Sequence, residues 1–283
     1  MKFTAVTLLA LGCAWCAQSA TAEDYATQAL QATYKIIHND STATCFLVRD
    51  TKAGEDQKGN FEAILVTANH VLAQMRSATA VLLLRQRRDD GTYARREVTI
   101  PVREDDKPLW TKHPQHDVAI LDVTLPNDVT ARPLPVACLA DEEALKTAGL
   151  HIGQSLLALS YPVRFEANSS GFPIARQLVL ASYPLIPVAP HPVFLVDMHT
   201  FPGDSGGPVF VSDPRLQGDP KNQSPLVLGL VVGMVRHDEK TKLMLEERTV
   251  HHALNLGTVL QSQFVLETIA LRKRSKATGG PEE

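Results

Sequence analysis

Three short segments of the sequence contain residues that could together break a peptide bond. One segment ends a hydrophobic run with His70, a second begins such a run with Asp117, and a third places Ser205 in a glycine-rich turn. A serine hydroxyl is a weak nucleophile at neutral pH, so it needs a base such as imidazole to take its proton during attack. A buried carboxylate can fix the imidazole tautomer and stabilise the imidazolium. These residue types predict acyl transfer through a covalent intermediate on Ser205.

The turn around Ser205 also has the composition of an oxyanion hole. Glycine adopts backbone angles that other residues avoid and allows close approach of the backbone. We therefore expect the amides of Gly203 and Ser205 to donate to the developing oxyanion. Each segment alone has a structural explanation, because a polar residue at a strand end is common and paired glycines often serve a tight turn. The three segments in one chain favour the chemical interpretation.

The sequences TANH, HDVAIL and GDSGGP resemble the active-site signatures of the trypsin-like (chymotrypsin-fold) serine proteases, in the same His, Asp, Ser order. The resemblance covers roughly residues 43–272. It implies a serine endopeptidase with an all-β fold of two perpendicular six-stranded β-barrels and a C-terminal helix. It also implies His70 and Asp117 on the first barrel, Ser205 on the second, and the catalytic cleft between them.

The sequence departs from the animal digestive members of that family. Val71 and Phe201 stand where those members have cysteines, and no Arg-Ile-Val-Gly-Gly-like activation site occurs. The pattern is similar to the cysteine-poor bacterial branch. In animal members, the aspartate before the serine pairs with a new N-terminus. Asp204 must therefore have another partner, or packing alone must hold its loop.

The family resemblance places the primary specificity residue at His199, followed by Thr200. Because neither is an aspartate, a trypsin-type preference for Arg or Lys is not expected. A hydroxyl residue and a histidine at these positions make a preference for acidic residues a hypothesis. The alternative is that His199 only ends a strand.

The hydrophobic pattern supports an all-β fold. Short segments rich in Val, Ile and Leu alternate with turn residues, and long helices do not alternate with them. We expect strands at 43–48, 63–67, 80–84, 97–102, 118–123, 155–160, 177–181, 193–196, 209–211 and 226–235. Helices are expected at 24–31, 142–147 and 257–272. The protease domain would span 23–272, with barrel one at about 32–138, barrel two at about 150–255, and a flexible tail at 273–283.

The first 22 residues predict a signal peptide. Lys2 precedes a largely apolar run at 3–17, and small residues at 20–22 suit cleavage after Ala22. That run is too short to span a bilayer, and no later run reaches the required length. We expect an exported protein, periplasmic or secreted, without a membrane span. Lipid attachment at Cys13 is the alternative.

Cleavage would leave Cys45 and Cys138, which could form one disulfide or remain two buried thiols. No Cys-His cluster has ligand spacing, so neither a metal nor another cofactor is expected. For His113, His116 and the pair at 251–252 we expect capping or solvent-facing roles.

The formal net charge of −3 gives no indication of a nucleic-acid partner. The expected partner is a protein or peptide substrate, and the oligomeric state stays open. Two functions remain in competition. The chain is either a serine endopeptidase or a catalytically silent peptide-binding protein with the protease fold.

Overall fold

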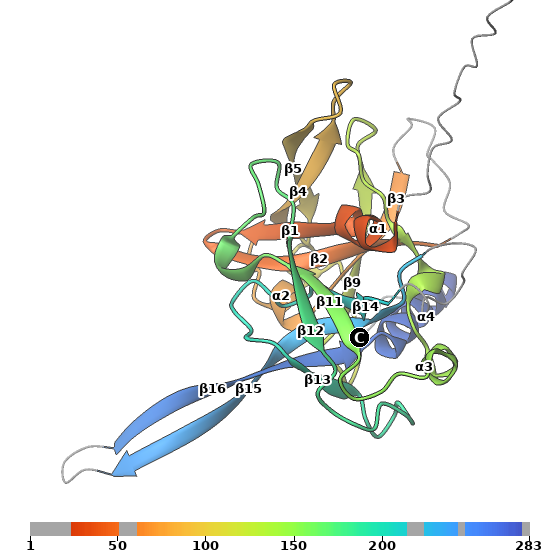
Figure 1. The fold of residues 1–283 in the computed structure, drawn as a ribbon. Coiled ribbons are helices and arrows are strands. Elements are labelled where there is room, and N and C mark those ends of the chain that lie inside the picture. Colours follow the sequence, from red (N-terminus) through yellow and green to blue (C-terminus); the bar gives the residue numbers. More distant parts are fainter. Residues whose placement is uncertain (1–23, 51–60, 214–223, 243–246, 279–283) are drawn as a thin grey trace, which may run out of the picture.

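The computed structural model describes residues 24–50, 61–213, 224–242 and 247–278 (Figure 1). The predicted signal peptide, including Cys13, lies outside the described residues. Every predicted strand segment overlaps a strand of the structure. The two main sheets hold the buried hydrophobic core between and within them.

The first sheet contains eight strands. Its order is β5 (Tyr93–Pro101), β4 (Thr79–Arg87), β1 (Thr33–His38), β2 (Ser41–Arg49), β3 (Phe61–Thr67), β9 (Ala119–Leu125) and β8 (Thr111–Lys112), and β10 (Leu134–Pro135) pairs with β2. Six of these strands are long, and β8 and β10 add two residues each. The predicted six strands of barrel one are thus present with two short additions. A separate two-stranded sheet joins β6 (Arg103–Glu104) to β7 (Lys107–Pro108).

The second sheet contains six strands, as predicted for barrel two. Its order is β12 (Ile174–Val179), β11 (Ser155–Ser160), β14 (Pro208–Val211), β15 (Val227–Lys242), β16 (Glu247–Gln261) and β13 (Val193–Asp197). An antiparallel bridge between Leu180 and Val196 brings its two edge strands together. The Ala181 amide extends this contact by donating to the Leu195 carbonyl at 2.8 Å.

In the described residues, four α-helices and two 3-10 turns connect or cover the sheets: α1 (Tyr25–Ala32), α2 (Asn69–Ala73), η1 (Val136–Cys138), α3 (Glu142–Ala148), η2 (Pro162–Arg164) and α4 (Gln263–Thr278). Asp24 caps α1 by accepting from the amides of Ala26 and Thr27. Gly149 ends α3 in the left-handed conformation, with φ 59°. None of the helices in the described part of the chain is long and apolar enough to cross a membrane.

The two remaining cysteines are separate thiols. Cys45 and Cys138 are both buried and unbridged, which decides between the two alternatives that the sequence left open. Burial raises the pKa of Cys138 to about 11 and also raises that of Cys45. Both thiols therefore stay protonated and act as small core residues.

The predicted C-terminal helix at 257–272 is wrong at its start. Residues 257–261 belong to β16, so the second sheet extends past the predicted boundary at 255, and the helix begins at Gln263. Leu260 pairs with Val193 of β13 on one side and Leu230 of β15 on the other, and this double pairing satisfies the backbone as strand. Residues 273–278, predicted as flexible tail, continue α4, and Lys273 and Lys276 form ion pairs with Asp50 and Asp122.

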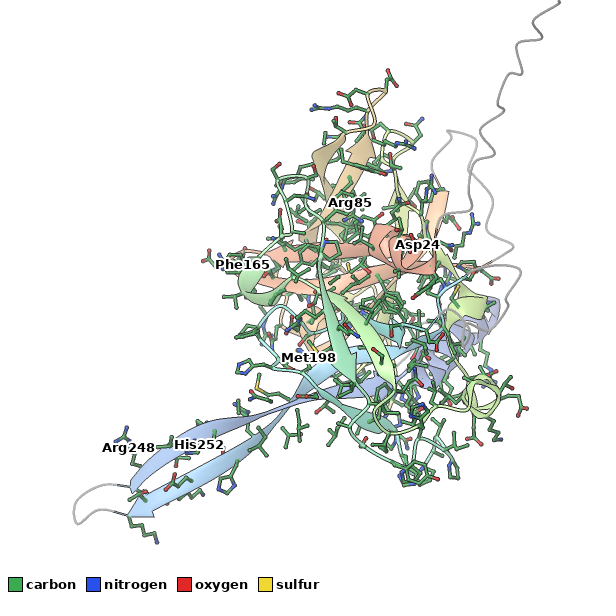
Figure 2. All side chains as sticks on the ribbon, in the orientation of Figure 1. Asp24, Arg85, Phe165, Met198, Arg248 and His252 are labelled. Carbon is green, nitrogen blue, oxygen red and sulfur yellow. The ribbon has the colours of Figure 1, made fainter. Side chains whose placement is uncertain are left out.

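Beyond the second sheet, β15 and β16 continue as a two-stranded arm. Its pairs run from Arg236–Ala253 to Lys242–Glu247. The arm projects away from both sheets, and the labelled Arg248 and His252 lie on it (Figures 1 and 2). No strand was predicted beyond residue 235, because the arm is polar on both faces and lacks the alternation that signals a half-buried strand.

Candidate active site

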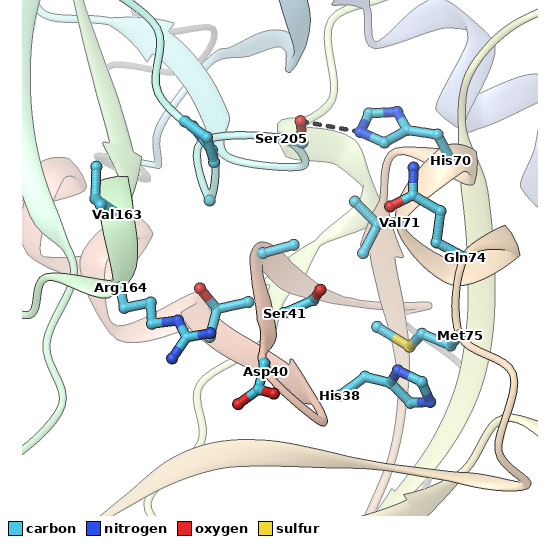
Figure 3. Close-up of a pocket in the computed structure, with 14 residues that line it drawn as sticks. His38, Asp40, Ser41, His70, Val71, Gln74, Met75, Val163, Arg164 and Ser205 are labelled. Carbon is cyan, nitrogen blue, oxygen red and sulfur yellow. Dashed lines mark hydrogen bonds between the residues drawn. The ribbon is translucent and has the colours of Figure 1, made fainter.

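The structure brings the three predicted catalytic residues together. His70 lies in the short helix α2, Asp117 lies between β8 and β9, and Ser205 lies between β13 and β14. His70 Nδ1 is 2.6 Å from Asp117 Oδ2, and His70 Nε2 is 3.0 Å from Ser205 Oγ. Figure 3 shows the second contact as a dashed line. The first sheet thus supplies the imidazole and the carboxylate, and the second supplies the hydroxyl.

The surroundings of Asp117 favour its ionised form, which can only accept hydrogen bonds. Its Oδ1 accepts the backbone N–H of His70 at 2.8 Å, while Oδ2 faces the ring. Burial alone would raise the pKa of Asp117, but the hydrogen bonds from the His70 ring and backbone outweigh it and lower that pKa. An ionised carboxylate can only accept, so Nδ1 of His70 carries the ring proton. This leaves Nε2 as an acceptor for the Ser205 hydroxyl.

Two amides in the serine loop have no hydrogen-bond acceptor in the part of the chain that the structure describes. Asp204, Gly206 and Gly207 donate their amides to Phe201, Val231 and Asp204 carbonyls, respectively. Within the described residues, no acceptor faces the amides of Gly203 and Ser205. These are the two donors that the sequence predicted for an oxyanion hole. Their freedom is what such a hole requires.

Two glycines of this loop occupy positions that no other residue fits. Gly203 has φ 102°, and a Cβ there would lie 2.2 Å from the Tyr161 carbonyl oxygen. Gly206 has φ 86°, and its Cβ would lie 2.0 Å from the Thr44 carbonyl oxygen. Both the backbone angle and the close approach therefore demand glycine.

The peptide bond before Gly203 has a fixed orientation. The Val163 amide donates to the Pro202 carbonyl at 2.7 Å. Because the C=O and N–H of a trans peptide point in opposite directions, this bond directs the Gly203 N–H away from Val163. One of the two unpaired donors is therefore held in place by a neighbouring loop.

Asp204 has a partly buried partner that the sequence did not reveal. Its side chain is fully buried, and Arg176 Nη2 of β12 lies 2.6 Å from its Oδ1. Ser160 donates to the same oxygen at 2.8 Å, and the Phe201 amide donates to Oδ2 at 2.7 Å. A side chain thus satisfies the carboxylate that the animal proteases pair with a new N-terminus.

The first sheet also holds the serine loop, through Thr44 of β2. The Thr44 amide donates to the Ser205 carbonyl at 3.0 Å, and its hydroxyl donates to the Gly203 carbonyl at 2.7 Å. Thr44 and Arg176 were not among the predicted site residues. No motif marks either, because each acts on a residue that is distant in sequence.

A cavity of about 420 Å³ opens beside the triad. It lies between the turn that joins β1 to β2, helix α2, and the loop at Val163 and Arg164 (Figure 3). The lining residues are His38, Asp40, Ser41, Thr42, Ala43, His70, Val71, Gln74, Met75, Val163, Arg164, Pro202, Gly203 and Ser205. Both sheets thus border a space that reaches the Ser205 hydroxyl.

The predicted specificity residues lie outside this cavity. The exposed His199 side chain places Nδ1 2.5 Å from Asn255 Oδ1, and its ring packs on Phe201 with centroids 4.4 Å apart. Thr200 is buried, with its hydroxyl 3.5 Å from the Met198 carbonyl. The structure therefore does not bring these two side chains together with the triad.

A family model described as the trypsin-like peptidase domain matches residues 43–218. An inactive-form crystal structure of a serine-to-alanine mutant of Rv3671c from M. tuberculosis H37Rv is similar, with TM-score 0.47 and 20% identity over 91% of this chain and 92% of that chain. An inactive form of the Rv3671c protease has TM-score 0.43 and 20% identity, covering 87% and 91%. No curated protein sequence matches this chain.

Proposed function

This chain belongs to the family of trypsin-like peptidases, and from that membership we propose an exported serine endopeptidase that works through a covalent acyl-enzyme on Ser205. The observation that carries the proposal is the continuous hydrogen-bonded series from Asp117 through His70 to Ser205. The unpaired amides of Gly203 and Ser205 support it, because a silent binding protein has no need of them.

In the proposed reaction, Ser205 Oγ attacks the substrate carbonyl carbon while His70 Nε2 takes the hydroxyl proton. The amides of Gly203 and Ser205 stabilise the oxyanion, and Asp117 stabilises the imidazolium. His70 then protonates the leaving amine as the C–N bond breaks, which leaves an ester on Ser205. A water molecule, deprotonated by His70, hydrolyses this ester and regenerates the serine.

The proposed substrate is a protein or a peptide. His199 and Thr200 remain proposed determinants on the acyl side, with a preference for acidic residues as the hypothesis to test. A peptide library analysed by mass spectrometry would map the cleavage sites. Enrichment of Glu or Asp before the cut would support these roles, and a preference that is unchanged by His199→Ala would contradict them.

A serine-reactive fluorophosphonate tests the catalytic proposal directly. We expect it to label the folded protein that begins at residue 23, and we expect no labelling of Ser205→Ala. Absence of both labelling and cleavage in a folded protein that still binds peptides would favour the silent binding protein instead.

Export has its own test. We expect the protein recovered from the periplasm or the medium to begin at residue 23, as determined by N-terminal sequencing. A lipid-modified N-terminus at Cys13 would show instead that the protein is anchored.

A further inference from the structure

The loop that carries Asp117 is a closed turn between β8 and β9. The backbone ladder that pairs Lys112 with Ala119 continues one step, because the His113 amide donates to the Val118 carbonyl at 3.0 Å. The Val118 amide in turn donates to the His116 carbonyl at 2.9 Å. The shape of this turn therefore sets where the Asp117 carboxylate lies relative to His70.

The ring of His113 holds the inside of this turn. Its Nδ1 accepts the amides of Gln115 and His116, each at 3.1 Å, and only 6% of the side chain is exposed. A ring nitrogen that accepts N–H donors carries no proton, so the hydrogen-bond network assigns the ring proton to Nε2. Nε2 faces Glu267 Oε2 at 3.3 Å. The buried His113 ring thus joins the turn to Glu267, with Nδ1 as the acceptor on one side and Nε2 as the donor on the other.

Helix α4 forms the outer wall of the same turn. The Phe264 ring packs against both histidine rings, with centroids 5.5 Å from His113 and 3.9 Å from His116. The helix is fixed to β9 by an ion pair between Arg272 and Asp122 at 2.8 Å. The C-terminal helix therefore braces the segment that immediately precedes Asp117.

We infer that His113 is a positioning residue for Asp117. It acts through the two amides that its Nδ1 accepts, and α4 holds its ring in place. The inference rests on the proposed function, because it assigns His113 a part in that reaction. Without this acceptor, two N–H groups in the turn lose their partner, and the turn relaxes away from His70. Because Asp117 contacts the base rather than the substrate, the effect falls on kcat and leaves KM unchanged.

Two substitutions test the two ring nitrogens of His113 separately. His113→Asn places a carbonyl oxygen where Nδ1 stands, which keeps the acceptor for the turn and loses the link to Glu267. His113→Gln places an amide nitrogen near Nε2, which keeps the donor to Glu267 and loses the acceptor. Each variant loses part of the ring, so each serves as the packing control for the other. We expect kcat to fall by about tenfold to 100-fold in the Gln variant and by only about threefold in the Asn variant.

A second readout does not depend on turnover. The His70 Nδ1 proton, bonded to Asp117, gives a downfield proton NMR signal. We expect this signal to shift in His113→Gln and to keep its position in His113→Asn. Equal kcat and equal signals in the two variants would overturn the inference. Decreases in kcat that are merely proportional to the decreases in Tm of the variants would also overturn it. If the two variants show the expected NMR difference but the fluorophosphonate does not label the wild-type protein, the proposed function is overturned and the inference about His113 is not.

Glu267→Ala covers the case in which the Gln variant does not fold. It removes the acceptor of Nε2 and leaves the ring in place. We expect kcat to fall by about threefold at unchanged KM, the size of one lost hydrogen bond, and the NMR signal to broaden. A Glu267→Ala variant with wild-type kcat and a wild-type signal would overturn the part assigned to α4.

Discussion

Two aspartates lie close to Ser205 in very different surroundings. Asp117 precedes β9, and 38% of its side chain is exposed to solvent while it bonds the ring of His70. Asp204 is the immediate neighbour of Ser205, is fully buried, and bonds Arg176, Ser160 and the Phe201 amide. The aspartate nearer to the serine in sequence is the one that does not contact the base.

The difference in burial separates two uses of the same side chain. Asp117 bonds a group whose charge changes during the proposed reaction, and its partial exposure leaves water to accommodate that change. The buried Asp204 is paired with the permanent charge of the partly buried Arg176, and breaking this pair would be costly because it would leave the carboxylate buried without a cation. Asp117 is thus suited to stabilising a changing charge on His70, and Asp204 is suited to holding the serine loop in place.

The largest expected effect is on catalysis, from Asp117→Asn. An asparagine amide donates to Nδ1 and so favours the wrong tautomer of His70. We expect kcat to fall by about 10⁴-fold with little change in Tm. Steady-state kinetics and thermal unfolding measure the two quantities. Asp89→Asn, in the exposed turn after β4, is the matched control and should change neither. A decrease in kcat of less than tenfold would contradict the catalytic role proposed for Asp117, and with it the difference between the two aspartates.

The next effect is on stability, from Arg176→Met. This change leaves the Asp204 carboxylate buried without its cation, and we expect the free energy of unfolding to fall by about 3–5 kcal/mol. Denaturant unfolding measures the loss. Adding Asp204→Asn should recover part of it, because a neutral amide costs less to bury. If the double variant is no more stable than Arg176→Met alone, the buried pair is not the cause.

Ser160→Ala should have a smaller effect on the same carboxylate. It removes the hydrogen bond that a neutral hydroxyl donates to the carboxylate at 2.8 Å and leaves the Arg176 pair in place. We expect a loss of about 1–2 kcal/mol in the free energy of unfolding. Ser155→Ala, which removes a more exposed bond with Gln177, is the control and should stay within about 0.5 kcal/mol of wild type. Equal losses of stability in the two variants would show that the hydrogen bond to Asp204 contributes no more than an exposed one.

The smallest expected effect is a dependence on pH. Hydrogen bonds from His70 lower the pKa of Asp117 in the folded protein despite its partial burial. Its stabilising contribution is therefore complete above the ordinary aspartate pKa of about 3.9 and is lost as the pH falls through the lower folded value. Urea unfolding of wild type and Asp117→Asn should show a stability difference that is constant near neutrality and shrinks in acid. A difference that grows in acid would contradict the assigned ionisation.

The sequence predicted the parts of the site that short motifs encode. His70, Asp117, Ser205 and the paired glycines are recognisable because each lies in a segment with a local reason for its residue types. Most of the long strands were also predictable, with β1 and β16 as exceptions, since Val, Ile and Leu mark their buried positions, as in β3.

The parts that the sequence did not reveal depend on tertiary contacts. The link from Arg176 to Asp204 and the link from Thr44 to Ser205 join distant segments, and neither residue lies in a motif. β1 was missed because it follows α1 directly, without a turn residue between them. The start of α4 was misplaced because Val259 and Leu260 suit either element until their strand neighbours are known.

The bonds from Thr44 to the serine loop bear on when the proposed activity can first appear. Thr44 belongs to the half of the chain that leaves the ribosome early, and Ser205 belongs to the half that follows. The loop takes its working shape only when the two halves pack together. A nascent or truncated chain that holds only one half lacks these bonds, so we expect the proposed activity only after both halves have been made and have packed together.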